Sequence, residues 1–487
     1  MAKKFTLTKG QKDIFNLIKD FVKDNRQKVF ILKGYAGTGK TTLVRHVIEH
    51  FVKEDIRFNL LATTGRAATI LSDITGHPAE TIHSMIYNYS DINQDMESVI
   101  KTIDDKGVEA TGQLYLTFDL KKVDPTTTNT IYIVDESSML SNEVASEVSQ
   151  AWFGSGKLLS DLLEFDPKGK FIFVGDACQL PPVGQTHSPA LSTLYFNQEL
   201  NILANSRELT EIVRQKGKND IIEASVVIRG LFAIAPESVE KGARVNWGRL
   251  PFRGYSDIEI HSTFDTFLKQ YLDLVKKEGY KYATLICDSN KRTRELALQV
   301  RRQLGFADGC VQEGDLLLVT QNNSLSGLTN GDFVIVKKVS PSVVNRAYMS
   351  FRQVEVQNIS TDEIFSQFII EEVLYSAQPN LDKRQQMNLT IDFARRMLAK
   401  GIKQGTDMFN RAMLEDPYFN ALRCVFGYAI TCHKSQGGEW AHVFVDLGKG
   451  RLMANPTKAS YQWIYTAMTR AKEKLHFVDG WYFAGHS

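Results

Sequence analysis

The segment from Gly34 to Thr41 has the residue types and spacing that suit binding of a nucleotide phosphate. It reads G-Y-A-G-T-G-K-T, the full glycine, lysine and threonine spacing of a phosphate-binding loop. Glycines let the backbone curl so that its N–H groups face phosphate oxygens, and a following helix adds its positive dipole end. We expect Lys40 to reach the outer phosphates and Thr41 to ligate Mg²⁺. A glycine-rich turn without function is the alternative. The residues expected around the phosphates are Gly34, Ala36, Gly37, Thr38, Gly39, Lys40, Thr41 and Thr42.

Two adjacent carboxylates end another apolar run and suit hydrolysis. Residues 131–134 read I-Y-I-V, a buried strand, and Asp135 and Glu136 follow directly. We expect Asp135 to hold the Mg²⁺ shell and Glu136 to orient the attacking water. A solvated strand end is the other interpretation, and the phosphate loop upstream makes it much weaker. Together the two segments predict ATP hydrolysis with ATP and Mg²⁺ as cofactors.

Three further side chains are candidates for sensing or stabilising the γ-phosphate. Gln179 follows the apolar run 171–174 in G-D-A-C-Q-L-P-P-V-G, where two prolines stiffen the loop. Phosphoryl transfer also needs positive charge against its transition state, and Arg214 and Arg470 are the candidates for that role. For an isolated arginine, a surface salt bridge is the commoner interpretation.

The elements that must position these residues alternate between strands and helices. Residues 29–32 predict a strand before the loop, and residues 42–52 predict an amphipathic helix after it. Apolar runs recur at 58–62, 131–134, 171–174 and 285–287, each with polar residues at its carboxyl end. Open α/β sheets place their ligands at this edge of parallel strands. The pattern predicts α/β cores with parallel sheets.

Two stretches break this alternation and predict insertions. Residues 87–130 are polar with interspersed aromatics (Tyr87, Tyr89, Tyr115 and Phe118), and we expect a partly β insertion there. Packing within the insertion is the favoured role for these rings, and stacking on bases is the alternative. Residues 314–423 offer β-like runs at 316–320, 333–338, 352–357 and 365–370, which suit a small antiparallel barrel, and then a helix at 381–400.

Bulk composition excludes some classes of protein and leaves the partner open. The chain has 487 residues, 43% hydrophobic and 23% charged, with a net charge of +2. These values are ordinary for a globular protein and by themselves predict neither a nucleic-acid nor an acidic partner. No apolar run approaches a membrane span, and the amino terminus lacks a secretory pattern. The five cysteines are scattered and form no C-x-x-C pair, so we expect a reducing, intracellular (cytoplasmic) location.

Taken in order, these segments resemble the motifs of superfamily 1 helicases over nearly the whole chain. The segments 62–68 (A-T-T-G-R-A-A), 81–84 (T-I-H-S), 428–439 (Y-A-I-T-C-H-K-S-Q-G-G-E) and 465–471 (Y-T-A-M-T-R-A) fill the remaining motif positions. The G-D-x-x-Q-L-P-P-V-G and H-K-S-Q-G sequences are similar to those of the RecD-like and phage Dda-like branch. The resemblance implies ATP-driven 5′→3′ movement on single-stranded DNA and unwinding of duplex.

The resemblance also implies a domain plan. It predicts two RecA-like domains with ATP between them, a small pin-bearing insertion and an SH3-like β-barrel insertion. Domain 1A would comprise residues 1–86 and 131–206, and its insertion 1B residues 87–130. Domain 2A would comprise residues 207–313 and 424–487, and its insertion 2B residues 314–423.

Further site residues follow from the resemblance alone. Gln11 falls at the position of the family's adenine-reading glutamine, and Glu439 is expected near the ribose. Thr64, His83, Thr431 and His433 fall on motifs that line the DNA face. For His83, a helix cap or core contact is the competing interpretation. Gly437-Gly438 departs from the usual motif and predicts a more flexible loop there.

Single-stranded DNA and single/double-strand junctions are the expected partners, with replication or recombination proteins as further candidates and no membrane. One alternative is a single-strand-stimulated ATPase that remodels protein–DNA complexes. Another is a RecD-type subunit of a larger recombination nuclease. A nucleotide-gated binding protein is less favoured, because Glu136 and two candidate arginines point to hydrolysis. RNA as substrate also stays open.

Overall fold

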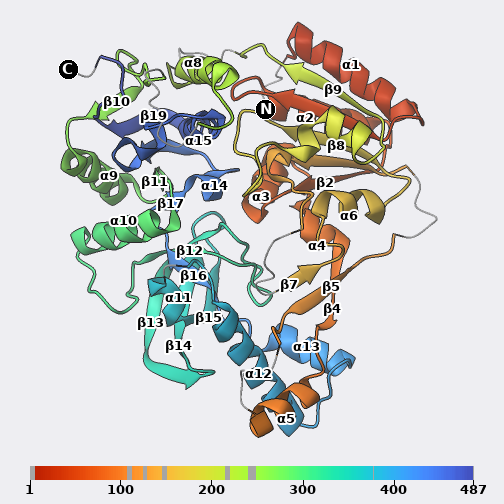
Figure 1. The fold of residues 1–487 in the computed structure, drawn as a ribbon, viewed down its shortest axis with the longest axis vertical. Coiled ribbons are helices and arrows are strands. Elements are labelled where there is room, and N and C mark those ends of the chain that lie inside the picture. Colours follow the sequence, from red (N-terminus) through yellow and green to blue (C-terminus); the bar gives the residue numbers. More distant parts are fainter. Residues whose placement is uncertain are drawn as a thin grey trace.

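The computed structural model describes residues 6–106, 112–123, 129–144, 151–213, 220–239, 248–376 and 378–485. Figure 1 shows two α/β bodies side by side, with a smaller body extending below each of them. The chain begins in the right-hand body, and its carboxyl end lies in the left-hand one. This arrangement agrees with the predicted α/β class and its two interrupted cores.

The first core is built on a six-stranded parallel sheet in the order β3–β2–β6–β8–β1–β9. Alternate residues of its apolar strands enter separate clusters on the two faces: Phe30 and Leu32 pack with α1 and α2, and Val29 and Ile31 pack with α6 and α7. The strands are β1 (Val29–Gly34), β2 (Phe58–Ala62), β3 (Ala79–Thr81), β6 (Ile131–Asp135), β8 (Lys170–Gly175) and β9 (Ala204–Leu209). The helices are α1 (Lys9–Lys23), α2 (Lys40–Lys53), α3 (Gly65–Thr75), α6 (Leu158–Phe165) and α7 (Thr193–Gln198).

The strand order decides which loops meet. β8 lies between β1 and β6, with Lys33 opposite Gly175 and Val134 opposite Phe173. Because all three strands run in the same direction, their carboxyl ends share one edge of the sheet. The phosphate loop after β1, Asp135 at the end of β6 and Asp176 just after β8 therefore lie at one edge.

The second core is built on a five-stranded parallel sheet in the order β10–β19–β18–β11–β17. Buried residues of α8 and α15 pack in one cluster with strand residues, and buried residues of α9 and α10 pack in another. The strands are β10 (Ile258–His261), β11 (Ala283–Cys287), β17 (Ile430–Thr431), β18 (Trp440–Val445) and β19 (Ala471–Val478). The helices are α8 (Asp220–Ile234), α9 (Phe264–Glu278), α10 (Asn290–Gln303), α14 (Cys432–Ser435) and α15 (Lys458–Met468).

The first insertion is partly β, as predicted, but its sheet reaches beyond residue 130. It contains β4 (Tyr87–Ile92), α5 (Met96–Lys106) and β5 (Leu116–Leu120), and it follows α4 (Ile82–Ile86), which packs in the first core. A third strand, β7 (Ala151–Phe153), pairs in parallel with β5 and comes from the stretch assigned to the first core by sequence. The stacking of Phe153 on Phe118 at 4.6 Å is a long-range contact that local patterning does not reveal. Tyr89 and Tyr87 join this ring cluster, so packing is confirmed for these aromatics.

The second insertion is an antiparallel sheet in the order β15–β14–β13–β12–β16. A single bridge joins Ile369 of β15 to Leu422, two residues before β16, and brings the two outer strands of the sheet close together. The predicted strand at 333–338 continues to Arg346, across an irregularity between Val339 and Val343 that hides it from pattern reading. The elements are β12 (Leu316–Val319), β13 (Phe333–Arg346), β14 (Met349–Asn358), β15 (Ile364–Ile370), β16 (Cys424–Phe426), α11 (Glu371–Tyr375), α12 (Lys383–Ala399) and α13 (Asp407–Glu415).

Two expected boundaries need correction. Residues 424–426 were assigned to the second core, but β16 pairs with β12 in the insertion, so the core resumes at β17. The first core was expected to end at residue 206, but β9 pairs with β1 as far as Leu209. Both errors concern strands whose partners are far away in sequence.

The two insertions share one hydrophobic core, although each comes from a different sheet. Ile92, Met96 and Val99 of the first pack in one cluster with Phe351 and Phe393 of the second. The Gln404 amide adds hydrogen bonds to Asp91 and to the Gln94 carbonyl, at 2.9 and 3.1 Å. The lower ends of both bodies are thereby joined, and α5 lies beside α12 in Figure 1.

Three short 3-10 helices complete the described structure, at Ser137–Met139, Pro189–Leu191 and Gly448–Met453. Across the described residues, no helix combines the length and the apolar content that crossing a membrane requires.

Candidate functional site

The loop after β1 has the backbone of a phosphate cradle. Gly37 and Gly39 have φ of +77° and +76°, which β-carbon-bearing residues rarely adopt. The Thr38 hydroxyl donates to the Tyr35 carbonyl at 2.8 Å and tightens the turn. α2 begins at Lys40, so Thr41 and Thr42 occupy its first turn, where the positive end of the helix dipole lies.

Lys40 and Gln11 both bind the backbone of this loop. The Lys40 ammonium donates to the Gly34 and Tyr35 carbonyls at 2.6 and 3.2 Å. The Gln11 amide donates to the Thr38 and Gly39 carbonyls at 3.2 and 3.3 Å. Gln11 is buried at the start of α1, where it also closes a capping box with Thr8. The structure thus places Gln11, which the resemblance assigns to the adenine, against the backbone of the phosphate loop.

Three carboxylates stand at the same edge of the sheet: Asp176 is buried, and Asp135 and Glu136 are half-buried. Burial raises the pKa of Asp135, Glu136 and Asp176 above their ordinary values, and the Lys40 ammonium opposes that rise at each of them. Glu136 has φ of +50°, an uncommon conformation for a residue other than glycine. Such carboxylates beside a lysine are suited to holding a cation and to accepting a proton from water.

Arg470 comes to these carboxylates from the second core. It follows α15, is 5% exposed, and its positive charge lowers the pKa of Glu136 and of Asp176. Its guanidinium donates to the Thr466 carbonyl and the Thr469 hydroxyl at 3.1 and 3.3 Å. The structure therefore places one of the two candidate arginines against Glu136. Arg214, the other, lies outside the described residues.

Helix α15 also binds the first core directly. The Tyr465 hydroxyl donates to Asp176 Oδ2 at 2.7 Å and accepts from the Ala36 N–H of the phosphate loop at 2.8 Å. The Leu180 N–H donates to the Thr466 hydroxyl at 2.9 Å, and the Gln462 amide donates to the Gln179 carbonyl at 3.3 Å. The 176–180 loop is thus held by the second core, as a loop that transmits position between cores would be.

A cation that the sequence did not reveal stands beside the phosphate loop. The Arg229 guanidinium, from α8, lies 4.0 Å from the centre of the Tyr35 ring, and its Nε is buried without a hydrogen-bond partner among the described residues. It is isolated in an apolar helix, and no motif marks it. Only the packing of α8 beside the loop shows its position.

The sequence matches two protein-family models, of which the first spans the first core, its insertion and α8, and the second lies in the carboxyl-terminal part of the second core. Residues 6–248 match an AAA domain, and residues 426–478 match a UvrD-like helicase C-terminal domain. The chain is 26% identical over 454 residues to the ATP-dependent RecD2 DNA helicase of Deinococcus radiodurans, covering 92% of this chain and 46% of RecD2. It is 42% identical over 81 residues to the ATP-dependent DNA helicase Dda of Enterobacteria phage T4, covering 16% of this chain and 18% of Dda.

The phosphate loop, the Asp135–Glu136 pair and Arg470 lie where the two cores meet. By these family models and relatives, the chain is similar to superfamily 1 helicases of the RecD-like and Dda-like branch. It spans less than half the length of RecD2. Among solved structures, Pif1 helicase from Bacteroides in complex with ADP-AlF3 and single-stranded DNA is 17% identical with a TM-score of 0.47, covering 97% of this chain and 92% of that one.

The four residues expected at the DNA face differ in their surroundings. Thr64 and Thr431 each follow a strand and cap the next helix, accepting from the Ala67 and Lys434 N–H groups at 3.2 and 3.4 Å. His83 and His433 are largely enclosed, and burial lowers the pKa of each imidazole. The His83 ring packs 5.0 Å from Phe153, which is the core contact weighed against a DNA role.

Glu439 does not lie in the enclosed part of the site. Its carboxylate is 56% exposed and pairs with Lys472 at 3.0 Å. Gly437 and Gly438 before it are closely packed: a β-carbon would lie 3.0 Å from the Ala67 β-carbon at Gly437 and 2.7 Å from the Arg66 Cζ at Gly438. The close approach of α3 from the first core, rather than flexibility, explains the glycine pair.

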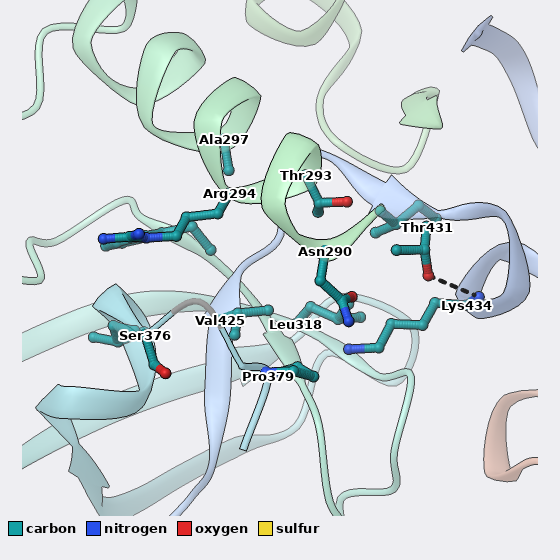
Figure 2. A pocket seen from close by; sticks show the side chains of 13 residues that line it. Asn290, Thr293, Arg294, Ala297, Leu318, Ser376, Pro379, Val425, Thr431 and Lys434 are labelled. Carbon is teal, nitrogen blue, oxygen red and sulfur yellow. Dashed lines mark hydrogen bonds between the residues drawn. The ribbon is translucent and has the colours of Figure 1, made fainter. Parts of the chain in front are cut away.

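Sequence reasoning also missed a mainly apolar pocket between the second core and its insertion, with several polar side chains at its wall. Figure 2 shows Asn290 and Arg294 of α10 together with Thr431 and Lys434 of the α14 segment around this pocket. They meet because β11 and β17 are parallel neighbours, with Cys287 opposite Thr431. Burial lowers the pKa of Lys434 to about 8. The signal available in the sequence was that Asn290 closely follows the predicted strand 285–287 and that Thr431 and Lys434 lie in the 428–439 motif.

Proposed function

We propose that this protein is an ATP-dependent DNA helicase that moves 5′→3′ on single-stranded DNA and unwinds duplex. The observation that carries this proposal is the meeting of Glu136 from one core with Arg470 from the other. A hydrolytic site divided in this way links nucleotide turnover to the separation of two bodies. A nucleotide switch needs no such divided hydrolytic site.

The residues at the interface fit the roles that hydrolysis requires. The positive-φ glycines and the amides before Lys40 suit a triphosphate, and Gln11 stands at the edge of this loop. Thr41 and Asp135 would hold Mg²⁺, which neutralises phosphate charge when bound. Glu136 orients the attacking water, Gln179 senses the γ-phosphate, and Arg470 stabilises the developing charge. We assign a second stabilising role to Arg214 and a place near the ribose to Glu439.

DNA would lie along the helix starts of the two cores. Thr64 caps α3 in the first core and Thr431 caps α14 in the second, so both stand at helix amino termini, which favour phosphate. Arg294 and Lys434 add positive charge beside Thr431. His83 and His433 are assigned contacts with the same strand. Alternate opening and closing of the cleft between the cores would then move these two phosphate grips along it.

The proposed division follows the sheets. Domain 1A comprises residues 1–86 and 131–209 without β7, and domain 2A comprises residues 210–313 and 427–487. The SH3-like character of the 314–426 sheet and the pin in the first insertion belong to this proposal. DNA as substrate and ATP as fuel place the protein inside the cell.

The test is unwinding of two partial duplexes, one with a 5′ single-stranded tail and one with a 3′ tail, with Mg-ATP. Unwinding of the 5′-tailed duplex alone supports the proposal, and unwinding of only the 3′-tailed duplex contradicts its polarity. Lys40→Ala should abolish both hydrolysis and unwinding. Lys53→Ala, an exposed change at the far end of the same helix, is the matched control. ATPase stimulated by single strands without unwinding of either substrate would favour the remodelling ATPase or the RecD-type subunit.

A further inference from the structure

A cluster of imidazoles on the second sheet plays no part in the proposed helicase mechanism. Glu259 and His261 are two positions apart on β10, the edge strand of the sheet. Their side chains therefore face the same side of the sheet. His476 on β19 stands opposite Glu259, and Phe444 on β18 stands opposite His476. His442 lies two residues before Phe444 and so faces the same side. Three neighbouring strands thus bring four polar side chains together.

Three of these side chains present ligand atoms to a common point. His476 Nδ1 lies 3.2 Å from His261 Nε2 and 3.4 Å from Glu259 Oε2. His261 Nε2 lies 3.9 Å from Glu259 Oε1. For tetrahedral Zn²⁺ with bonds of about 2.0–2.1 Å, ligand atoms are about 3.3 Å apart. The two separations that involve His476 are close to this edge length, and one ligand atom from each of the three residues lies within 4.8 Å of the other two.

The fourth side chain, His442, is placed to orient one of the three proposed ligands. His442 Nδ1 lies 2.8 Å from His476 Nε2, so the ring nitrogen of His476 that faces away from the cluster also has a partner. Metal-bound histidines usually donate this second N–H to a neighbour, which fixes the tautomer and the ring orientation. Phe444 stacks on the His476 ring at 4.1 Å and 4°, which fixes its plane as well.

The protonation states suit ligands. Burial lowers the pKa of His476, His261 and His442, and the nearby Lys474 ammonium lowers that of His476 further. Of the charged groups facing the cluster, Glu473 and Glu259 act to raise the pKa of His442, and Lys474 acts to lower it. The imidazoles are therefore neutral at pH 7, as metal ligands must be.

Solvent reaches the cluster from one side only. Both histidine side chains are at most 5% exposed, whereas that of Glu259 is 47% exposed and is held by the Gln270 amide at 3.1 Å. A cation could enter past Glu259, and water could fill the fourth position. The cluster lies on β10, at the edge of the sheet farthest from β17, so it is separate from the DNA-facing pocket.

We propose that Glu259, His261 and His476 form a binding site for a divalent transition metal of the Zn²⁺ class. The site fastens the four-residue edge strand β10 to β19. Two imidazoles and one carboxylate favour Zn²⁺ or Co²⁺ over Mg²⁺ or Ca²⁺, which prefer oxygen ligands. Its role is structural, because it holds together strands that are distant in sequence.

The test is titration of chelator-treated full-length protein with Co²⁺, followed by its visible absorption. Excess Mg²⁺ is present throughout, to occupy the oxygen ligands near Asp135. The wild type should bind one equivalent with tetrahedral absorption, and Zn²⁺ should displace it and raise the melting temperature. Glu259→Gln and His261→Ala should each abolish this binding, and His442→Ala should weaken it by roughly 10–100-fold.

His50→Ala, which removes an imidazole beside Glu54 elsewhere in the molecule, should leave Co²⁺ binding unchanged. Glu259 is exposed, so Glu259→Gln keeps the test valid if His261→Ala fails to fold. Absence of saturable Co²⁺ binding in the wild type would overturn the proposal and leave the imidazoles as a neutral hydrogen-bonded chain. Binding that survives in Glu259→Gln and in folded His261→Ala would overturn it equally. Neither result bears on the helicase assays.

Discussion

The Tyr465 hydroxyl bridges the two cores by donating to Asp176 Oδ2 at 2.7 Å while accepting from the Ala36 N–H at 2.8 Å. The Ala36 N–H belongs to the loop that we assign to phosphate. A nucleotide that uses this N–H therefore competes with Tyr465. Closing of the second core on the first and occupation of the loop are thus coupled through one phenol.

Tyr465→Phe should tighten nucleotide binding. The variant loses the competitor for the Ala36 N–H, and a hydrogen bond contributes about 0.5–1.5 kcal/mol, so we expect roughly 2–10-fold lower Kd for ADP. Titration with a fluorescent nucleotide measures it. Tyr461→Phe is the matched control, because its hydroxyl donates to the Gly248 carbonyl from the same helix. Unchanged or weaker ADP binding by Tyr465→Phe would show that the bridge does not compete with nucleotide.

Arg470→Ala should lower kcat for ATP hydrolysis by about 10³–10⁵ with little change in KM. The reason is that its charge acts on Glu136 and on the transition state rather than on bound substrate alone. Steady-state hydrolysis with saturating single-stranded DNA tests this. Arg470→Lys keeps the charge but loses the guanidinium geometry and should give an intermediate rate. If circular dichroism shows that Arg470→Ala is unfolded, a structural role would replace the catalytic one.

Glu136→Gln should stabilise the fold at neutral pH. Burial raises the pKa of Glu136 above its ordinary value of 4.5, so the folded protein holds this proton more tightly than the unfolded chain does. The ionised carboxyl therefore destabilises the fold above pH 4.5, and this cost disappears below it. The melting temperature of Glu136→Gln should exceed that of the wild type at pH 7–8 by roughly 2–4 °C per kcal/mol relieved.

This advantage of Glu136→Gln should shrink as pH falls towards 4.5, while its hydrolysis is lost at every pH. Glu164→Gln, a change at an exposed carboxyl on α6, should show no such pH-dependent difference in melting temperature. A melting temperature for Glu136→Gln below the wild-type value at pH 8 would mean that attraction to Arg470 outweighs the cost of burial.

Affinity for single-stranded DNA should fall as pH rises through 8. Burial lowers the pKa of Lys434 to about 8, so its ammonium loses its charge between pH 7 and 9. Lys434→Ala should weaken binding at pH 7 and reduce the salt slope by about 1. Fluorescence anisotropy at several salt concentrations measures both. Lys277→Ala, at an exposed lysine on α9, is the control. If Lys434→Ala kept the wild-type pH dependence, another group would be responsible.

Some features of this protein were readable from the sequence because they are local. The glycine, lysine and threonine spacing of residues 34–41 lies within one turn and one helix start, and Asp135 and Glu136 are adjacent at a strand end. The polar ends of successive apolar runs also indicated that these groups share one edge, since parallel strands end on the same side. The order of the segments then carried the family resemblance.

Tertiary structure alone decided the contacts between segments that are distant in sequence. Strand pairing shows that β7 belongs to the first insertion and β16 to the second. Hydrophobic periodicity predicts a strand but not its partner, so these assignments could not be made from the sequence. Packing of α8 brought Arg229 to Tyr35, and closure of α15 brought Tyr465 to Asp176 and Ala36. The same cause gathered Glu259, His261 and His476 from two strands. Such groups carry no spacing signal, because only the folded sheet sets the distance between them.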